Sequence, residues 1–128
     1  MLIFVYGTLL KGLERSYVLD HSELLGDAVA GGVCLYNLGA YPAIKRSDGA
    51  VIGELYDVDD ITLETLDRIE GFDPNNFDNS LYLRSEIRII APSTTIPVFS
   101  YLYNLQVDDK MLIEDGDCRN YLKGKTVR

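Results

Sequence analysis

The residues best suited to chemistry near the start of the chain are Tyr6, Gly7, Thr8 and Leu9, which directly follow the apolar run Leu2–Val5. The run predicts a buried strand, and Gly7 marks a position where the backbone turns or is closely approached. A turn of this kind after a strand points several backbone N–H groups the same way, which suits a carboxylate, a carbonyl or an oxyanion. An ordinary tight turn explains the same residues without any ligand.

Glu70 is the carboxylate whose position is hardest to explain by stability alone. In a helix expected at residues 61–70, Glu70 shares one face with Leu63 and Leu66, so it points toward the core side. It also lies in the last turn, where the helix dipole disfavours negative charge. Burial and the dipole both raise the pKa of a carboxyl group. Glu70 is therefore a candidate functional residue, and a frayed helix end that releases it into water is the alternative.

Six short motifs, in their order along the chain, resemble those of the gamma-glutamylcyclotransferase-like family. The motifs are Tyr6-Gly7-Thr8-Leu9, Gly53-Glu54-Leu55-Tyr56, Leu66-Asp67-Arg68-Ile69-Glu70-Gly71-Phe72, Tyr82-Leu83-Arg84, Tyr101-Leu102-Tyr103 and Ile113-Glu114-Asp115-Gly116-Asp117. The ordered set, which covers most of the chain, carries the resemblance. The chain looks most like the short single-domain members, which include enzymes acting on gamma-glutamyl amines. It departs from the family at Cys118, where an aromatic residue is common.

The resemblance implies a gamma-glutamyl cyclotransferase. In this reaction the alpha-amine of a gamma-glutamyl substrate attacks its own gamma-carbonyl and releases 5-oxoproline with an amine or an amino acid. The resemblance also implies that Glu70 is the general acid/base, and that neither a metal nor a cofactor takes part. Because nucleophile and electrophile belong to one molecule, the main task of such an enzyme is to fold and hold its substrate.

The residues expected to bind the substrate are Tyr6, Gly7, Thr8, Leu9, Tyr82, Arg84 and Tyr103. Arg84 suits a substrate carboxylate through a bidentate contact, but an ion pair with Glu86 or Asp57 explains it equally well. Tyr103, with Tyr101 on the same strand face, either reaches the substrate or Glu70 or packs in the core. Tyr6, at the end of the first strand, either lines the pocket with its ring and hydroxyl or is a half-buried strand tyrosine.

Glu54 is the rival carboxylate, because it shares a strand face with Ile52 and Tyr56 and becomes the next candidate if Glu70 is exposed. Two other function classes stay open beside the enzyme. A non-catalytic protein would use the same pocket to bind a small amino-acid-like metabolite. A protein-interaction module would present an exposed apolar patch and no enclosed pocket.

Composition and charge exclude further classes of function and indicate the number of domains. We expect residues 1–128 to form a single gamma-glutamyl cyclotransferase-like domain, with a frayed tail at about 121–128. The net charge of −8 argues against nucleic acid and gives no reason to expect an anionic membrane as partner. The chain has two cysteines without metal-ligand spacing and a single histidine, His21. We expect no signal peptide and no membrane-spanning run, and these features together favour a cytoplasmic protein. The resemblance implies a small-molecule gamma-glutamyl substrate as partner, and we expect a monomer or weak homodimer.

Strands outnumber helices among the expected elements. We expect strands at 50–58, 82–91 and 97–103, and a bent or bulged strand at 24–38. A strand end and turn are expected at 36–42, a hairpin turn at Ser47-Asp48-Gly49 and a loop at 72–80. The expected helices are a short one at 13–21 and one at 61–70, which Asp59-Asp60 cap and Gly71 ends. This pattern predicts an α+β protein on a bent or closed sheet. The resemblance implies the same fold, a small mixed β-barrel with a few flanking helices.

Overall fold

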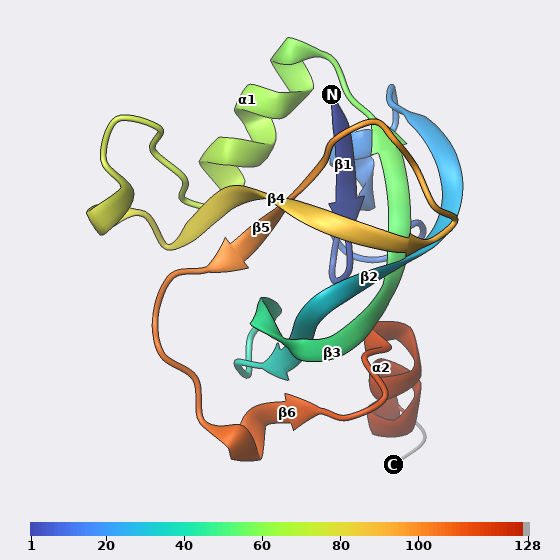
Figure 1. Ribbon diagram of the computed structural model, residues 1–128, viewed down its shortest axis with the longest axis vertical. Coiled ribbons are helices and arrows are strands. Elements are labelled where there is room, and N and C mark those ends of the chain that lie inside the picture. The colour runs from blue at the N-terminus through green and yellow to red at the C-terminus, as the bar shows by residue number, and fades with distance from the viewer. Residues whose placement is uncertain (127–128) are drawn as a thin grey trace.

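Five strands close into a small mixed barrel in the computed structural model, which describes residues 1–126 (Figure 1). The strands are β1 (Leu2–Val5), β2 (Glu23–Asn37), β3 (Pro42–Asp57), β4 (Tyr82–Ala91) and β5 (Val98–Tyr103). Around the ring they pair in the order β1, β3, β2, β4, β5, and β5 returns to β1. The β5–β1 contact is parallel and the others in the ring are antiparallel. The expected α+β fold on a closed mixed barrel is confirmed.

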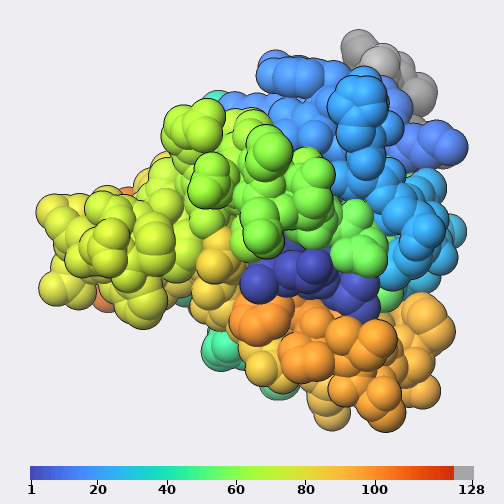
Figure 2. All heavy atoms as spheres, turned by 90° about the horizontal axis from the view of Figure 1, so that it is seen from above, coloured from blue at the N-terminus to red at the C-terminus, as the bar shows by residue number. Residues whose placement is uncertain are grey.

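Shorter elements cover the barrel. They are the strand β6 (Leu112–Ile113) on the edge of β2, the helices α1 (Asp60–Ile69) and α2 (Cys118–Thr126), and the 3-10 turns η1 (Ser16–Leu19), η2 (Phe77–Asn79) and η3 (Asp109–Met111). The two helices lie at opposite ends of the molecule in Figure 1. Figure 2 shows α1 in green against the blue segment that contains η1, which it contacts. Among the described residues, no helix is long and apolar enough to cross a membrane.

The bend of β3 corrects one prediction. Ser47-Asp48-Gly49 does not reverse the chain, because the pairing with β2 continues from Gly31 opposite Ala50 to Val33 opposite Arg46. The three residues form a bulge opposite a single β2 residue, and a bulge of this kind bends a strand. The chain reverses instead at residues 38–41, inside the expected turn, where the Leu38 amide donates to the Tyr41 carbonyl at 3.1 Å. The expected bulges in β2 are present at two irregular positions.

The helix α1 forms as its sequence predicts. Asp59 caps its first turn by accepting a hydrogen bond from the Thr62 amide at 2.8 Å. Glu70 is the C-terminal cap, and Gly71 follows with a φ of +65°, a conformation that glycine adopts without steric cost. Leu66 is fully buried, so the apolar face packs on the barrel and fixes the direction in which the helix end points.

One further expectation needs correction, because the expected helix at 13–21 is reduced to the short turn η1. The helix α2 includes residues 121–126 of the expected tail, and residues 127–128 lie outside the described part of the chain. Tyr82 at the start of β4 is buried, because its ring packs on Tyr103 and Tyr41.

Candidate active site

The turn after β1 and the end of α1 line the same pocket, which has a volume of about 250 Å³. Six of the residues proposed from the sequence lie in its lining: Tyr6, Gly7, Thr8, Leu9, Glu70 and Tyr82. They come from three separate parts of the chain, and the barrel brings them together because β1 lies between β3 and β5 while α1 leads into β4. These six candidate residues therefore share one cavity.

The residues of the turn that line this pocket include backbone amides without a backbone acceptor. The Leu10 amide donates to the Gly7 carbonyl at 2.9 Å, and the Arg15 amide donates to the Thr8 carbonyl at 2.8 Å. Among the described residues, no backbone acceptor takes the amides of Gly7, Thr8 or Leu9. A Cβ atom on Gly7 would lie 2.5 Å from Pro42 Cγ, so only glycine lets the turn approach Pro42 this closely. The turn thus has the donors that an oxyanion requires.

Glu70 is half-buried at the pocket wall, and burial raises the pKa of its carboxyl from 4.5 to about 7. The Arg15 guanidinium, which also lines the pocket, opposes this rise without cancelling it. The alternative of a helix end frayed into water does not describe this side chain. Near neutral pH such a carboxyl is present in both protonation states, which is the condition for a group that must take up a proton and return it.

Tyrosines form much of the remaining wall. The Tyr6 hydroxyl donates to the Tyr101 carbonyl at 2.9 Å, and the Tyr82 hydroxyl donates to the Pro42 carbonyl at 3.1 Å. Burial, assisted by the nearby Glu70 carboxylate, raises the pKa of both phenols, so both stay neutral. Their rings line the pocket while their hydroxyl groups donate to backbone oxygens, so these tyrosines shape the site.

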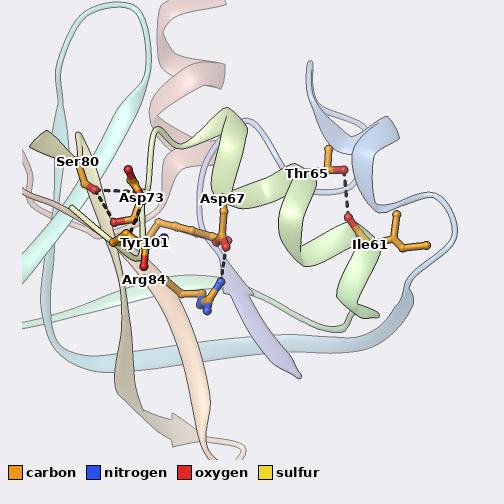
Figure 3. A network of polar contacts seen from close by, with 8 residues as sticks. Ile61, Thr65, Asp67, Asp73, Ser80, Arg84 and Tyr101 are labelled. Carbon is orange, nitrogen blue, oxygen red and sulfur yellow. Dashed lines mark hydrogen bonds and ion pairs between the residues drawn. The ribbon is translucent and has the colours of Figure 1, made fainter. Parts of the chain in front are cut away.

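A polar network ties α1 to the barrel beside this pocket (Figure 3). Asp67 of α1 accepts a hydrogen bond from the Tyr101 hydroxyl at 2.6 Å on one oxygen and pairs with the Arg84 guanidinium through the other. The Arg84 guanidinium also lies 5.3 Å from the centre of the Phe72 ring. Because Asp67 is one turn before Glu70, the network fixes the part of the helix that holds the candidate catalytic residue.

Two expected substrate-binding residues lie outside the pocket lining. Arg84 forms its ion pair with Asp67, and not with either of the expected partners, Glu86 and Asp57. Tyr103 packs on the pocket residue Tyr82, with 5.3 Å between the two ring centres. Its neighbour Tyr101 is the one that lines the cavity. Arg84 and Tyr103 therefore lie behind the residues that line the pocket.

The rival carboxylate Glu54 lies in a different place. Its side chain is 9% exposed and accepts a hydrogen bond from the Lys11 amide at 2.8 Å. Its other oxygen pairs with the Arg119 guanidinium of α2 at 3.3 Å, and the same guanidinium donates to the Lys11 carbonyl. Glu54 thus ties the end of the β1 turn to α2, and its contacts are those of a structural carboxylate.

Sequence reasoning missed three pocket or support residues: Arg15, Tyr41 and Asp67. The spacing of Asp67 and Glu70, three positions apart on one helix, was a signal that could have identified Asp67. Arg15 and Tyr41 lie in loops, and no local sequence pattern identifies either of them as a pocket residue. No group of three or more His, Cys, Asp or Glu side chains in the described part of the chain is placed to hold a metal ion.

The comparison with known families agrees with this geometry. The model of the family described as gamma-glutamyl cyclotransferase, AIG2-like, matches residues 3–120. The chain belongs to this family. Its function is therefore of the gamma-glutamylcyclotransferase kind, as the motifs implied.

Individual relatives span nearly the whole chain. The gamma-glutamylcyclotransferase family protein YtfP of Escherichia coli K12 is 36% identical over 117 residues, which are 91% of this chain and 95% of that protein. The gamma-L-glutamyl-butirosin B gamma-glutamyl cyclotransferase of Niallia circulans is 28% identical over 120 residues, 93% of this chain and 76% of that protein. A solved structure from Pyrococcus horikoshii has a TM-score of 0.81 at 24% identity and covers 100% of this chain and 98% of its own, which shows the shared fold.

Proposed function

We propose that this protein is a gamma-glutamyl cyclotransferase in which Glu70 is the general acid/base. The observation that carries the proposal is the half-buried Glu70 carboxyl, whose pKa is raised to about 7, in one pocket with the amides of the β1 turn. Family membership and the activity for which the Niallia circulans relative is named support the reaction class. The residues of the pocket support the assignment of roles that follows.

The reaction begins with the substrate's alpha-ammonium group. Ionised Glu70 takes one proton from it, and the free amine then attacks the gamma-carbonyl carbon, which closes a five-membered ring. The carbonyl electron pair moves onto oxygen, and the amides of Gly7, Thr8 and Leu9 stabilise the resulting oxyanion. The tetrahedral intermediate at this stage carries a positive ring nitrogen and a negative oxygen.

The collapse of the intermediate returns the proton. Protonated Glu70 donates to the nitrogen of the leaving group, the carbon–nitrogen bond breaks, and the oxyanion re-forms the carbonyl of 5-oxoproline. Glu70 then removes the second proton from the ring nitrogen and passes it to the departing amine, so the carboxylate is restored. A carboxyl with a pKa near neutral suits both transfers, because neither direction is strongly uphill.

The remaining residues hold the substrate. Tyr6 and Tyr82 enclose the gamma-glutamyl chain directly, and Arg84 and Tyr103 support the site from behind the wall. Glu70 supplies the proton transfers and backbone amides stabilise the developing charge, so we also propose that no metal or cofactor takes part. We further propose that the protein acts in the cytoplasm, as a monomer or weak homodimer, on a small molecule. Undiminished activity after dialysis against EDTA is the expected result for a metal-free mechanism.

Release of 5-oxoproline tests the proposed function. A panel of gamma-glutamyl amides, with leaving groups from methylamine to amino acids, is incubated with the wild-type protein, and 5-oxoproline is measured by mass spectrometry. Release from at least one member supports the proposal. Binding of these amides without any release would instead favour a non-catalytic protein that holds such metabolites.

A further inference from the structure

Arg15 lines the pocket that holds Glu70, but the catalytic steps proposed above leave it without a role. It lies on the loop between the β1 turn and η1, and its backbone is held on both sides. The Arg15 amide donates to the Thr8 carbonyl at 2.8 Å, and its carbonyl accepts from the Val18 amide at 3.1 Å. Since η1 also contacts α1, the loop is tied both to the turn with the candidate oxyanion donors and to the helix that Glu70 caps.

The charge of Arg15 is not neutralised by an acidic side chain within the part of the chain that the structure describes. The residue is half-buried, yet it forms no ion pair even with Glu70 of the same pocket. Its guanidinium still acts on the pocket interior, because it opposes the rise in the pKa of both Glu70 and Tyr82. Partial burial of an unpaired cation costs stability, so an anionic ligand explains this position better than packing does.

We propose that Arg15 binds the alpha-carboxylate of the gamma-glutamyl substrate through a bidentate contact with its guanidinium. The inference rests on the proposed function, which places the substrate's alpha-ammonium group at Glu70. The carboxylate is bonded to the same carbon as that ammonium group, so it lies beside Glu70 as well. Glu70 and Arg15 thus offer the zwitterionic end of the substrate a complementary anion and cation within one pocket.

This assignment separates two anions that the pocket must hold. The backbone amides of the β1 turn suit a carboxylate as well as an oxyanion. An available guanidinium takes the carboxylate and leaves those amides for the oxyanion at the gamma-carbonyl. Because Arg15 and Thr8 are joined through their backbones, the two sites keep a fixed spacing. A substrate held at both ends is folded toward the ring that its own amine closes.

A substrate with a neutral group in place of the carboxylate tests the contact. The alpha-carboxamide analogue of gamma-glutamyl-methylamide has nearly the same shape, and its cyclisation releases methylamine and 5-oxoprolinamide. The two substrates differ in intrinsic reactivity, so the change in preference between protein variants measures the contact. We expect Arg15→Met to lower the preference in kcat/KM for the carboxylate substrate at least about tenfold, the usual size of a lost charge-assisted contact.

Two further variants show whether the loss belongs to the guanidinium. Arg15→Lys keeps the charge without the planar fork, so we expect it to retain part of the preference. Arg68→Gln removes an exposed cation from α1, near Glu70 in the chain, and should leave the preference unchanged. Equal losses on both substrates in Arg15→Met would assign this residue to the shape of the loop and overturn the inference. An unchanged preference would place the carboxylate at the turn amides and overturn it too.

Binding of the two cyclic products provides a measurement that needs no turnover. 5-Oxoproline and 5-oxoprolinamide differ in the same way as the substrates, and NMR titration of wild type and Arg15→Met measures their dissociation constants. We expect the substitution to weaken 5-oxoproline at least about tenfold and 5-oxoprolinamide by no more than about twofold. Equal weakening of both products, or of neither, would overturn the inference.

The inference and the proposed function fail in different ways. Release of 5-oxoproline by the wild type, with a preference that Arg15→Met does not change, would overturn the carboxylate contact and leave the proposed function intact. If no gamma-glutamyl amide releases 5-oxoproline, but 5-oxoproline binding depends on Arg15, the proposed function fails and the carboxylate site stands. Failure of both measurements would overturn both proposals.

Discussion

Asp67 accepts a hydrogen bond from the Tyr101 hydroxyl at 2.6 Å, which joins α1 to β5 one helical turn before Glu70. The same carboxylate pairs with Arg84 of β4, and the side chains of both partners are mostly buried, with 16% of Asp67 and 21% of Arg84 exposed. The position of Glu70 at the pocket therefore depends on contacts that lie outside the pocket. A buried ion pair of this kind is costly to break from one side, because the remaining charge stays desolvated.

Removal of the Asp67 charge should loosen this attachment. We expect Asp67→Asn to lower the free energy of unfolding by about 2 kcal/mol, because Arg84 loses its charged partner, and to lower kcat as Glu70 becomes less well held. Urea denaturation and 5-oxoproline release measure the two effects. Asp78→Asn, at an exposed position in η2, is the matched control. Unchanged stability and kcat in Asp67→Asn would show that the network does not hold the helix end.

The dependence of activity on pH follows from the protonation of Glu70. The general base must be ionised in the free enzyme, and its pKa is about 7, so kcat/KM should rise with pH through about 7 and then level off until a second group titrates. A rate profile between pH 5 and 9 with gamma-glutamyl-methylamide measures the midpoint. A rise centred near pH 4.5, the ordinary value for glutamate, would mean that the base is a solvent-exposed carboxyl.

The same shift makes Glu70 a burden on stability at high pH. Between pH 4.5 and about 7 the folded protein keeps a proton on Glu70 that the unfolded chain releases, so stability falls as pH rises through this interval. A shift of this size corresponds to roughly 3 kcal/mol. Glu70→Gln has no such proton, so its stability relative to the wild type should increase from pH 4.5 to 8. Thermal unfolding at both pH values measures the difference, and a constant difference would contradict the assigned pKa.

Glu54 provides a prediction for the turn. Glu54→Ala removes the acceptor of the Lys11 amide and leaves Arg119 without its partner, so the turn loses its attachment to α2. We expect about a tenfold loss in kcat/KM, with the pH midpoint unmoved because Glu70 is untouched. Glu54→Gln keeps an acceptor for Lys11 and should lose less, and Asp57→Asn on the same strand is the control. A shifted midpoint in Glu54→Ala would indicate a direct part in proton transfer.

Local signals in the sequence were sufficient for the helix and for the side that Glu70 faces. Asp59, Gly71 and the apolar positions act within a few residues of each other, and helical geometry then determines where Glu70 points. The pattern of strands likewise identified β4 and β5 to within one residue. Elements whose determinants are local in the chain were therefore predictable.

Features that depend on distant partners were not predictable. Ser47-Asp48-Gly49 suits a reversal or a bulge equally, and only its pairing with β2 across the sheet selects the bulge. The partner of Arg84 follows from the way α1 packs on β4, and no local pattern in the sequence encodes this contact. The position of Glu54 away from the pocket also depends on distant partners. Its carboxylate oxygens accept hydrogen bonds from the Lys11 amide and from Arg119 of α2.

The most direct test of the central claim compares wild type with Glu70→Gln in 5-oxoproline release from the gamma-glutamyl amide that the wild type turns over best. Calorimetric binding of that substrate provides the control, because glutamine keeps the shape of the side chain and removes its base. We expect kcat to fall by at least about a hundredfold, with substrate binding retained, because the general acid/base is lost. A kcat within a few-fold of wild type in a folded Glu70→Gln protein would contradict it.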